Sequence, residues 1–127
     1  MSLQKYFEQT KGLGVLATAD SQGKVGIAVY ARPHVLEDGL VAFIMSDRLT
    51  HLNLQSNPQA AYLFKEEGAG YKGKRLYLSK IREEENSELL NTLRRRVYTT
   101  EKEGPPESKF LVIFRIDKEL PLVGTGN

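Results

Sequence analysis

The stretch that decides the fold is Leu40–Phe64, LVAFIMSDRLTHLNLQSNPQAAYLF. It opens on an apolar run without alternation, Leu40–Met45, which predicts a strand buried on both faces. A short helix is predicted over Arg48–Ser56, and it ends before Asn57-Pro58 because the residue preceding a proline is pushed out of the helical region. Ala60–Phe64 follows as another strand. The stretch therefore predicts strand, short helix and strand in direct succession.

Further strands are predicted on both sides of this stretch. Before it lie a β-rich run over Gly14–Ala19 and a long strand over Val25–Leu36. Glu37-Asp38-Gly39 joins the long strand to the apolar run, and Asp-Gly between two β-rich runs is a strong hairpin signal. After it, strands are predicted over Lys74–Ile81 and Phe110–Ile116. Six strands joined mainly by short turns indicate antiparallel pairing and a small closed or nearly closed barrel.

Two helices are predicted outside the central stretch. Residues 3–10 have apolar side chains at helical spacing, and Asn86 or Ser87 can cap a later helix with its leucines on one side. Arg94-Arg95-Arg96 lie near the end of this later helix, where cations complement the helix dipole. Gly104-Pro105-Pro106 then breaks the chain before the last strand.

Length and composition predict one globular domain over residues 1–127. The chain has 40% hydrophobic and 27% charged residues, and its net charge of +2 is too small to indicate nucleic acid or membrane as a partner. It has no cysteine and only two histidines, which excludes disulfides, a thiolate metal site and a cysteine nucleophile, so we assign no metal ligands. Neither a signal-peptide stretch nor the ~20 apolar residues of a membrane helix occurs, and the default expectation is a cytoplasmic protein.

One candidate site lies on the long predicted strand. Because side chains alternate across a strand, Ala28, Tyr30, Arg32 and His34 share one face. An aromatic ring, a guanidinium and an imidazole on one face suit a planar, anionic ligand. The alternative is a solvated strand face with ordinary cross-strand pairs.

A second candidate lies where the buried strand runs into the short helix. The free N–H groups and positive dipole of a helix start favour anions, and Ser46, Arg48 and Thr50 add two hydroxyls and a charge. The alternative is plain capping by Ser46 or Asp47, and the Asp47 carboxylate opposes an anion unless it turns away.

Other chemistry is weakly indicated. The carboxylates of Glu83-Glu84-Glu85 precede a predicted helix, where a solvated face or a helix start is the ordinary interpretation. Tyr71 and Tyr77 are interleaved with basic residues, as on a surface that binds single-stranded nucleic acid, but an exposed barrel strand accounts for them equally. No set of side chains assembles into a catalytic triad, and no catalytic residue is assigned.

The order of elements, and above all Asn53–Pro58 followed by Ala60–Phe64, resembles the pyridoxamine 5'-phosphate oxidase-like FMN-binding split barrels over residues 3–116. This resemblance implies a mainly β fold, a six-stranded antiparallel split barrel with short flanking helices. It also implies a homodimer with FMN at the interface, and a flavin-dependent oxidoreductase acting on an unknown small molecule.

The resemblance also implies where the cofactor lies. It places the flavin ring against the long predicted strand, which carries Tyr30, Ala31 and Arg32, and against the start of the next strand. It places the phosphate where that next strand meets the short helix, at Ser46 and a triplet at Arg48-Leu49-Thr50, and Met45 is a further cofactor residue. The family's lysine is missing from this triplet, so Arg48 has to supply the charge, unless the register slips by one residue and brings His51 into its place. A family glutamine that reaches the flavin corresponds to Arg75.

The resemblance does not extend to vitamin B6 oxidation. The chain ends without the Arg-x-His element and tryptophan of true pyridoxamine-phosphate oxidases. Four alternatives remain open beside FMN chemistry. They are a non-enzymatic flavin carrier, a barrel that binds haem or a deazaflavin, a barrel that binds single-stranded nucleic acid, and a dimer that has lost its ligand.

Overall fold

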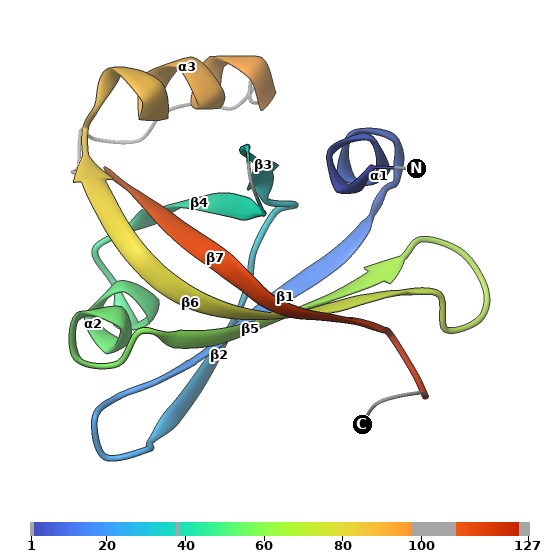
Figure 1. Ribbon diagram of the computed structural model, residues 1–127, viewed down its shortest axis with the longest axis horizontal. Coiled ribbons are helices and arrows are strands. Elements are labelled where there is room, and N and C mark those ends of the chain that lie inside the picture. The colour runs from blue at the N-terminus through green and yellow to red at the C-terminus, as the bar shows by residue number, and fades with distance from the viewer. Residues whose placement is uncertain (1, 38, 98–108, 125–127) are drawn as a thin grey trace.

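The computed structural model describes residues 2–37, 39–97 and 109–124, with side chains through residue 94 in the middle segment. Seven antiparallel strands form one sheet, in the order β2-β1-β5-β6-β7-β4-β3, and three helices lie around it (Figure 1). The strands are β1 (Gly12–Ala19), β2 (Val25–Val29), β3 (His34–Val35), β4 (Leu40–Ser46), β5 (Gln59–Glu66), β6 (Gly73–Glu85) and β7 (Lys109–Pro121). The helices are α1 (Leu3–Gln9), α2 (Leu49–Ser56) and α3 (Glu88–Val97).

The prediction of a single long strand over residues 25–36 is wrong. This segment forms two strands, β2 and β3, and the sheet therefore has seven strands instead of the predicted six. β2 pairs with β1 at one end of the sheet, whereas the two residues of β3 pair with β4 at the other end. Residues 30–33 cross between the two ends. Pro33 is buried in this crossing, and a proline cannot donate to a sheet ladder. The break therefore leaves the barrel split between β2 and β3.

The crossing is fixed from inside the barrel by Tyr62 of β5. The Tyr62 hydroxyl donates to the carbonyl of Ala31 at 3.1 Å, and its ring is almost completely buried. Gly14 leaves room for this hydroxyl, because a Cβ at Gly14 would lie 1.9 Å from it and 2.6 Å from the carbonyl oxygen of Tyr30. The backbone at Tyr30 and Ala31 is thus held by the core.

The core has two parts on opposite faces of the sheet. Inside the barrel, aromatic and aliphatic side chains from α1, α2 and most strands pack together, among them Phe7, Phe43, Tyr62, Phe64 and Phe114. On the outer face, Leu90 and Leu93 of α3 pack against Ala42, Leu111 and Ile113. β4 is therefore covered on both faces, as its unbroken apolar sequence predicts.

Several boundaries differ from the sequence prediction. β6 and β7 are longer than expected, and Glu83–Glu85 belong to β6, paired with Val112–Phe110, because bulges let the strand continue. Ser87 caps α3 as predicted, with its Oγ 3.1 Å from the amide nitrogen of Leu90. Asp38 of the predicted turn and the predicted break at residues 104–106 lie outside the described residues.

Capping of α2 by Ser46 or Asp47 is also wrong. The N-cap is Arg48, with no side-chain capping bond. Among the described residues, no helix has the length and apolarity to cross a membrane.

Candidate functional site

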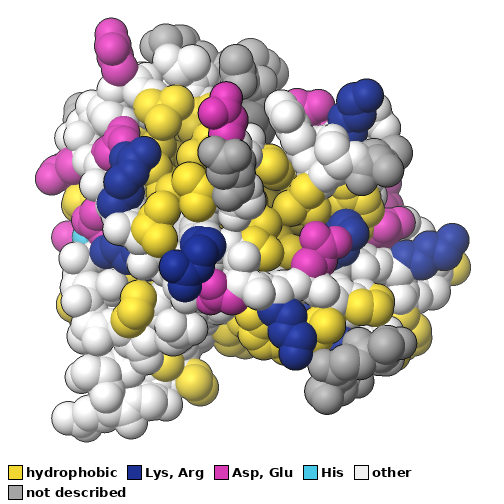
Figure 2. All heavy atoms as spheres, in the orientation of Figure 1, with side chains coloured by type: hydrophobic (Ala, Val, Ile, Leu, Met, Phe, Trp, Pro, Cys, Tyr) yellow, Lys and Arg dark blue, Asp and Glu magenta, His cyan; other side chains and the backbone are white. Residues whose placement is uncertain are grey.

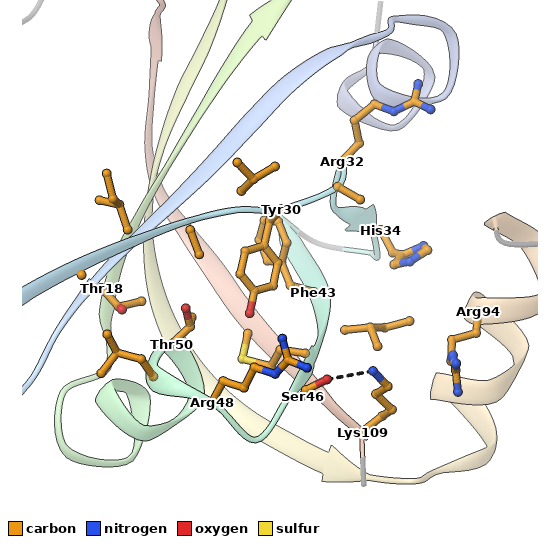
Figure 3. Close-up of a pocket in the computed structure, with 18 residues that line it drawn as sticks. Thr18, Tyr30, Arg32, His34, Phe43, Ser46, Arg48, Thr50, Arg94 and Lys109 are labelled. Atoms are coloured by element: carbon orange, nitrogen blue, oxygen red, sulfur yellow. Dashed lines mark hydrogen bonds between the residues drawn. The ribbon is translucent and has the colours of Figure 1, made fainter. Parts of the chain in front are cut away.

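A cavity of about 440 Å³ opens between the crossing segment, β4 and the start of α2 (Figure 3). This volume falls within the range of small-molecule sites, roughly 300–1,000 Å³. Its apolar part is contributed by β2, the crossing and β4, including Val29, Tyr30, Phe43 and Met45. The Tyr30 and Phe43 rings meet edge to face at 5.9 Å. The cavity can therefore take a ligand with a flat apolar part.

The polar lining of the cavity is basic. Arg32, His34, Arg48, Arg94 and Lys109 line it, and no Asp or Glu does so among the described residues. These side chains come from four separate parts of the chain: the crossing with β3, the start of α2, α3 and the start of β7. A cavity with cations and no carboxylates favours an anionic ligand.

One polar end is built at the N-terminus of α2. Thr50 is buried there, and the Tyr30 hydroxyl forms a hydrogen bond with it (Figure 3). Burial raises the pKa of Tyr30, although the bond to Thr50 and the nearby charge of Arg48 oppose this shift. The phenol therefore stays protonated near neutral pH and serves as a hydrogen-bond donor or acceptor.

Lys109 supplies a cation that the sequence did not point to. Its Nζ donates to Ser46 Oγ at 2.8 Å, which places it where β4 leads into α2. Ser46 and Lys109 are directly paired across β4 and β7, although they are 63 residues apart in the chain. A lysine ammonium therefore lies at Ser46, although the Arg48-Leu49-Thr50 triplet itself contains no lysine.

Arg94 is a second site residue that the sequence interpretation missed. Its position near the end of α3 predicts only that it complements the helix dipole, but it also borders the cavity (Figure 3). The packing of Leu90 and Leu93 on the outer face of β4 and β7 determines this placement. No local motif marks either Arg94 or Lys109, because both reach the cavity through strand pairing and helix packing.

The structure brings eight of the nine predicted cofactor residues to this one cavity. These are Tyr30, Ala31, Arg32, Met45, Ser46, Arg48, Leu49 and Thr50. The Arg32 guanidinium, however, binds backbone carbonyls of the protein itself: its Nη1 donates to those of Phe7 and Thr10 at 2.9 and 2.8 Å. Arg75 does not line the cavity, and its guanidinium bonds the carbonyl of Pro121 at 2.8 Å.

The two histidines are placed differently. His34 lines the cavity. His51 is buried outside it, with Nδ1 2.8 Å from Asp47 Oδ1 and Nε2 2.9 Å from Glu83 Oε2. The register slip that would put His51 in the place of the missing lysine is therefore not seen. The part of the chain that the structure describes contains no group of three or more His, Cys, Asp or Glu that could hold a metal ion.

The basic residues of the alternative nucleic-acid surface are largely engaged. Lys74 pairs with Glu119 at 2.6 Å, Lys80 with Glu83 at 2.7 Å, and Arg82 with Glu84. On the face shown in Figure 2, Lys and Arg side chains are scattered among acidic and hydrophobic ones and do not form one patch. The concentrated charge on which single-strand binding depends is therefore not seen on this face.

Comparison with known proteins identifies the fold. No protein-family model and no curated protein matches the sequence. Among solved structures, an FMN-binding protein from Syntrophomonas wolfei is similar, with a TM-score of 0.76 and 21% identity over 96% of this chain and 84% of that one. An F420 reductase gives a TM-score of 0.72 at 13% identity, over 94% of this chain and 98% of that one.

A third similar structure is HutZ, the haem storage protein of Vibrio cholerae. Its TM-score is 0.62 at 18% identity, over 94% of this chain and 91% of that one. Structures described as pyridoxamine 5'-phosphate oxidase-like also match. At these identities the likeness shows the fold alone. The chain has a mainly β split-barrel fold of this type, which confirms the predicted fold class apart from the strand count.

Proposed function

We propose that this protein binds FMN in the cavity and uses it in oxidation–reduction of a small molecule. The observation that carries the proposal is a cavity whose described lining residues include cations and no carboxylate. It lies beside a helix N-terminus without a side-chain cap and has an apolar, aromatic wall. The similarity to an FMN-binding protein supports it. The bound flavin would supply the redox chemistry, which the side chains of a cysteine-free chain do not offer.

The residues present fit the two ends of an FMN molecule. Arg48, Thr50, Ser46 and Lys109 gather charge and hydroxyl groups at the start of α2, where a phosphate is favoured. Tyr30, Ala31 and Met45 would contact the flat ring. His34 and Arg94 also line the cavity, where they could meet an anionic group of the substrate.

A homodimer is part of this proposal. The outer face of the sheet exposes Val25, Ile27 and Val29 of β2, each more than 70% accessible, next to Leu13 and Leu63. A soluble monomer rarely exposes an apolar patch of this kind. Ile27 and Val29 also border the cavity, so a second copy on this face would help to enclose the ligand. Arg75 lies in the same cross-strand row as Leu63 and could approach a cofactor only from a second copy.

The experiment is to release and identify the ligand of the purified protein, and then to titrate the empty protein with FMN and with riboflavin. We expect released FMN, and we expect FMN to bind at least about tenfold more tightly than riboflavin, because the phosphate meets the charges at α2. A colourless protein that also fails to bind added FMN would refute the proposal.

Haem is the second candidate ligand, favoured by the likeness to HutZ and by His34 at the cavity wall. Haem carries two carboxylates that a basic cavity would also accept. Absorption spectra recorded while haem, FMN and a deazaflavin are offered in turn separate these cases. A growing Soret band together with no binding of FMN would favour haem.

A further inference from the structure

Asp47 lies between two residues that line the cavity, Ser46 and Arg48, yet it does not line the cavity itself. Its side chain is 71% exposed, and Oδ1 accepts a hydrogen bond from Nδ1 of His51 at 2.8 Å. The carboxylate next to the basic end of the cavity is therefore held one helical turn along α2. The carboxylate is thus turned toward His51 and does not line the cavity, which is the condition that the sequence sets for an anion to bind here.

The position matters because Asp47 would otherwise compete with an anionic ligand. α2 begins at Leu49, and no side chain caps it at Arg48. The first amides of a helix lack partners within the helix, and they attract carboxylates as well as phosphates. A released Asp47 carboxylate would reach the same amides and add a negative charge beside Arg48.

The His51 side chain, which belongs to α2, is held in place by contacts with the strands β6 and β7. Its side chain is 7% exposed and stacks on Phe110 of β7 at 3.9 Å. Nε2 lies 2.9 Å from Glu83 of β6, and Glu83 also accepts from Lys80 at 2.7 Å and Gln55 at 3.0 Å. The imidazole is thus held independently of Asp47, and Nδ1 is aimed at the carboxylate by the packing of the barrel.

We propose that His51 is a positioning residue for the anion site: it holds the Asp47 carboxylate away from the N-terminus of α2, and this raises the affinity for a ligand's phosphate. This inference rests on the proposed phosphate-binding function of the cavity. It assigns a binding role to a buried histidine that does not touch the ligand.

Two substitutions distinguish the roles of the two ring nitrogen atoms of His51. In His51→Gln the amide nitrogen is as many bonds from Cα as Nε2, so the bond to Glu83 can form while Asp47 is released. In His51→Asn the amide nitrogen corresponds to Nδ1 and can still hold Asp47. We expect H51Q to weaken FMN binding about tenfold, because one negative charge is added near the phosphate, and to leave riboflavin binding unchanged. We expect the FMN affinity of H51N to stay within about threefold of that of the original protein.

The decisive variant is Asp47→Asn in the H51Q background. Removing the carboxylate should restore FMN affinity to within about twofold of the original, whereas D47N alone should change it little, because Asp47 is already held away. A purely structural role of His51 would not be rescued in this way. His51→Phe, which keeps a ring against Phe110, is a second releasing variant in case H51Q does not fold.

Each outcome decides the inference. Unchanged FMN affinity in folded H51Q and H51F, or failure of D47N to restore binding, would overturn it while leaving FMN binding intact. A second titration uses inorganic phosphate, followed through the backbone amide NMR signals of Leu49 and Thr50. If the original protein binds phosphate but not FMN, the proposed function fails and the same variants still test His51. If it binds neither, both proposals fail.

Discussion

Arg32 and Arg48 both border the cavity, but their guanidinium groups do different things. That of Arg32 turns toward α1, where Nη1 donates to the carbonyls of Phe7 and Thr10 at 2.9 and 2.8 Å (Figure 3). These two carbonyls lie near the C-terminal end of α1, where a cation is also favoured by the helix dipole. Arg48 is exposed at the start of α2 and faces the cavity. One arginine therefore stabilises the fold and the other is available to a ligand.

This difference gives a paired prediction at the residue scale. Arg32→Ala should lower the free energy of unfolding by about 1–3 kcal/mol, because two charge-assisted hydrogen bonds are lost, and should change FMN affinity less than about threefold. Arg48→Ala should weaken FMN binding about tenfold or more, with unchanged riboflavin binding and unfolding free energy within about 0.5 kcal/mol. Urea unfolding and FMN titration of both variants check this. Loss of FMN binding in a folded R32A protein would contradict the assignment.

At the scale of elements, the contact between α2 and β6 runs through Glu83. Burial raises the pKa of Glu83, but hydrogen bonds from Gln55, Lys80 and His51 outweigh it and lower this pKa to about 2 from 4.5. Two of these partners, Gln55 and His51, belong to α2, whose first turn carries Thr50. The ionised carboxylate of Glu83 therefore stabilises the placement of the helix whose N-terminus borders the cavity.

The pH dependence of this contact follows from the direction of the shift. Because the pKa is lower in the folded than in the unfolded state, the stabilisation is complete above about pH 4.5 and is lost as the pH falls through about 2. Glu83→Gln should lower the free energy of unfolding by about 1–2 kcal/mol at pH 7. This value allows for the solvent, which screens the charge of the partly exposed carboxylate. The difference from the original protein should shrink as the pH falls below 4.5.

Urea unfolding of the original protein and of E83Q at pH 7, 4.5 and 3 measures this effect. Glu67→Gln, at an exposed loop position, is the matched control and should leave the free energy of unfolding within about 0.5 kcal/mol. A difference between E83Q and the original protein that stays constant over this pH range would show that the carboxylate charge does not stabilise the contact.

At the scale of the whole molecule, the outer sheet face is expected to pair with a second copy. Ile27→Lys places a charge in the middle of β2, where the side chain is 75% exposed, so the monomer should still fold. We expect the original protein to have the mass of a dimer in solution and I27K that of a monomer, with weaker FMN binding because the cavity loses its cover. Light scattering coupled to size-exclusion chromatography gives the masses.

Thr92→Lys provides the control for this prediction, since Thr92 is exposed on α3 and away from β2. It adds the same charge and should leave the mass and the FMN affinity unchanged. An original protein that is monomeric at micromolar concentration would contradict the dimer, and FMN binding by that monomer would show that the cavity suffices alone.

Local sequence signals predicted most of the elements that frame the site. The unbroken apolar run of β4, the Asn57-Pro58 helix end and the serine cap of α3 each depend on neighbouring residues only, and the structure has all three. The division of the long strand at Pro33 was missed because residues 25–36 have β-forming sequence throughout, and only sheet closure sends its two parts to opposite ends. A proline within a predicted strand was the available signal.

The sequence by itself determined a barrel of antiparallel strands, and it determined the local segments that carry Tyr30, Ser46, Arg48 and Thr50. Only the tertiary structure decided which charges face the cavity. Strand register pairs Lys109 with Ser46, and helix packing places Arg94 at the cavity wall. The Arg32 guanidinium donates to a carbonyl of α1. The buried His51 forms a hydrogen bond with Asp47, which keeps that carboxylate out of the cavity. The physical reason is range: secondary structure follows from contacts a few residues apart, whereas the direction of a long charged side chain follows from partners many residues away.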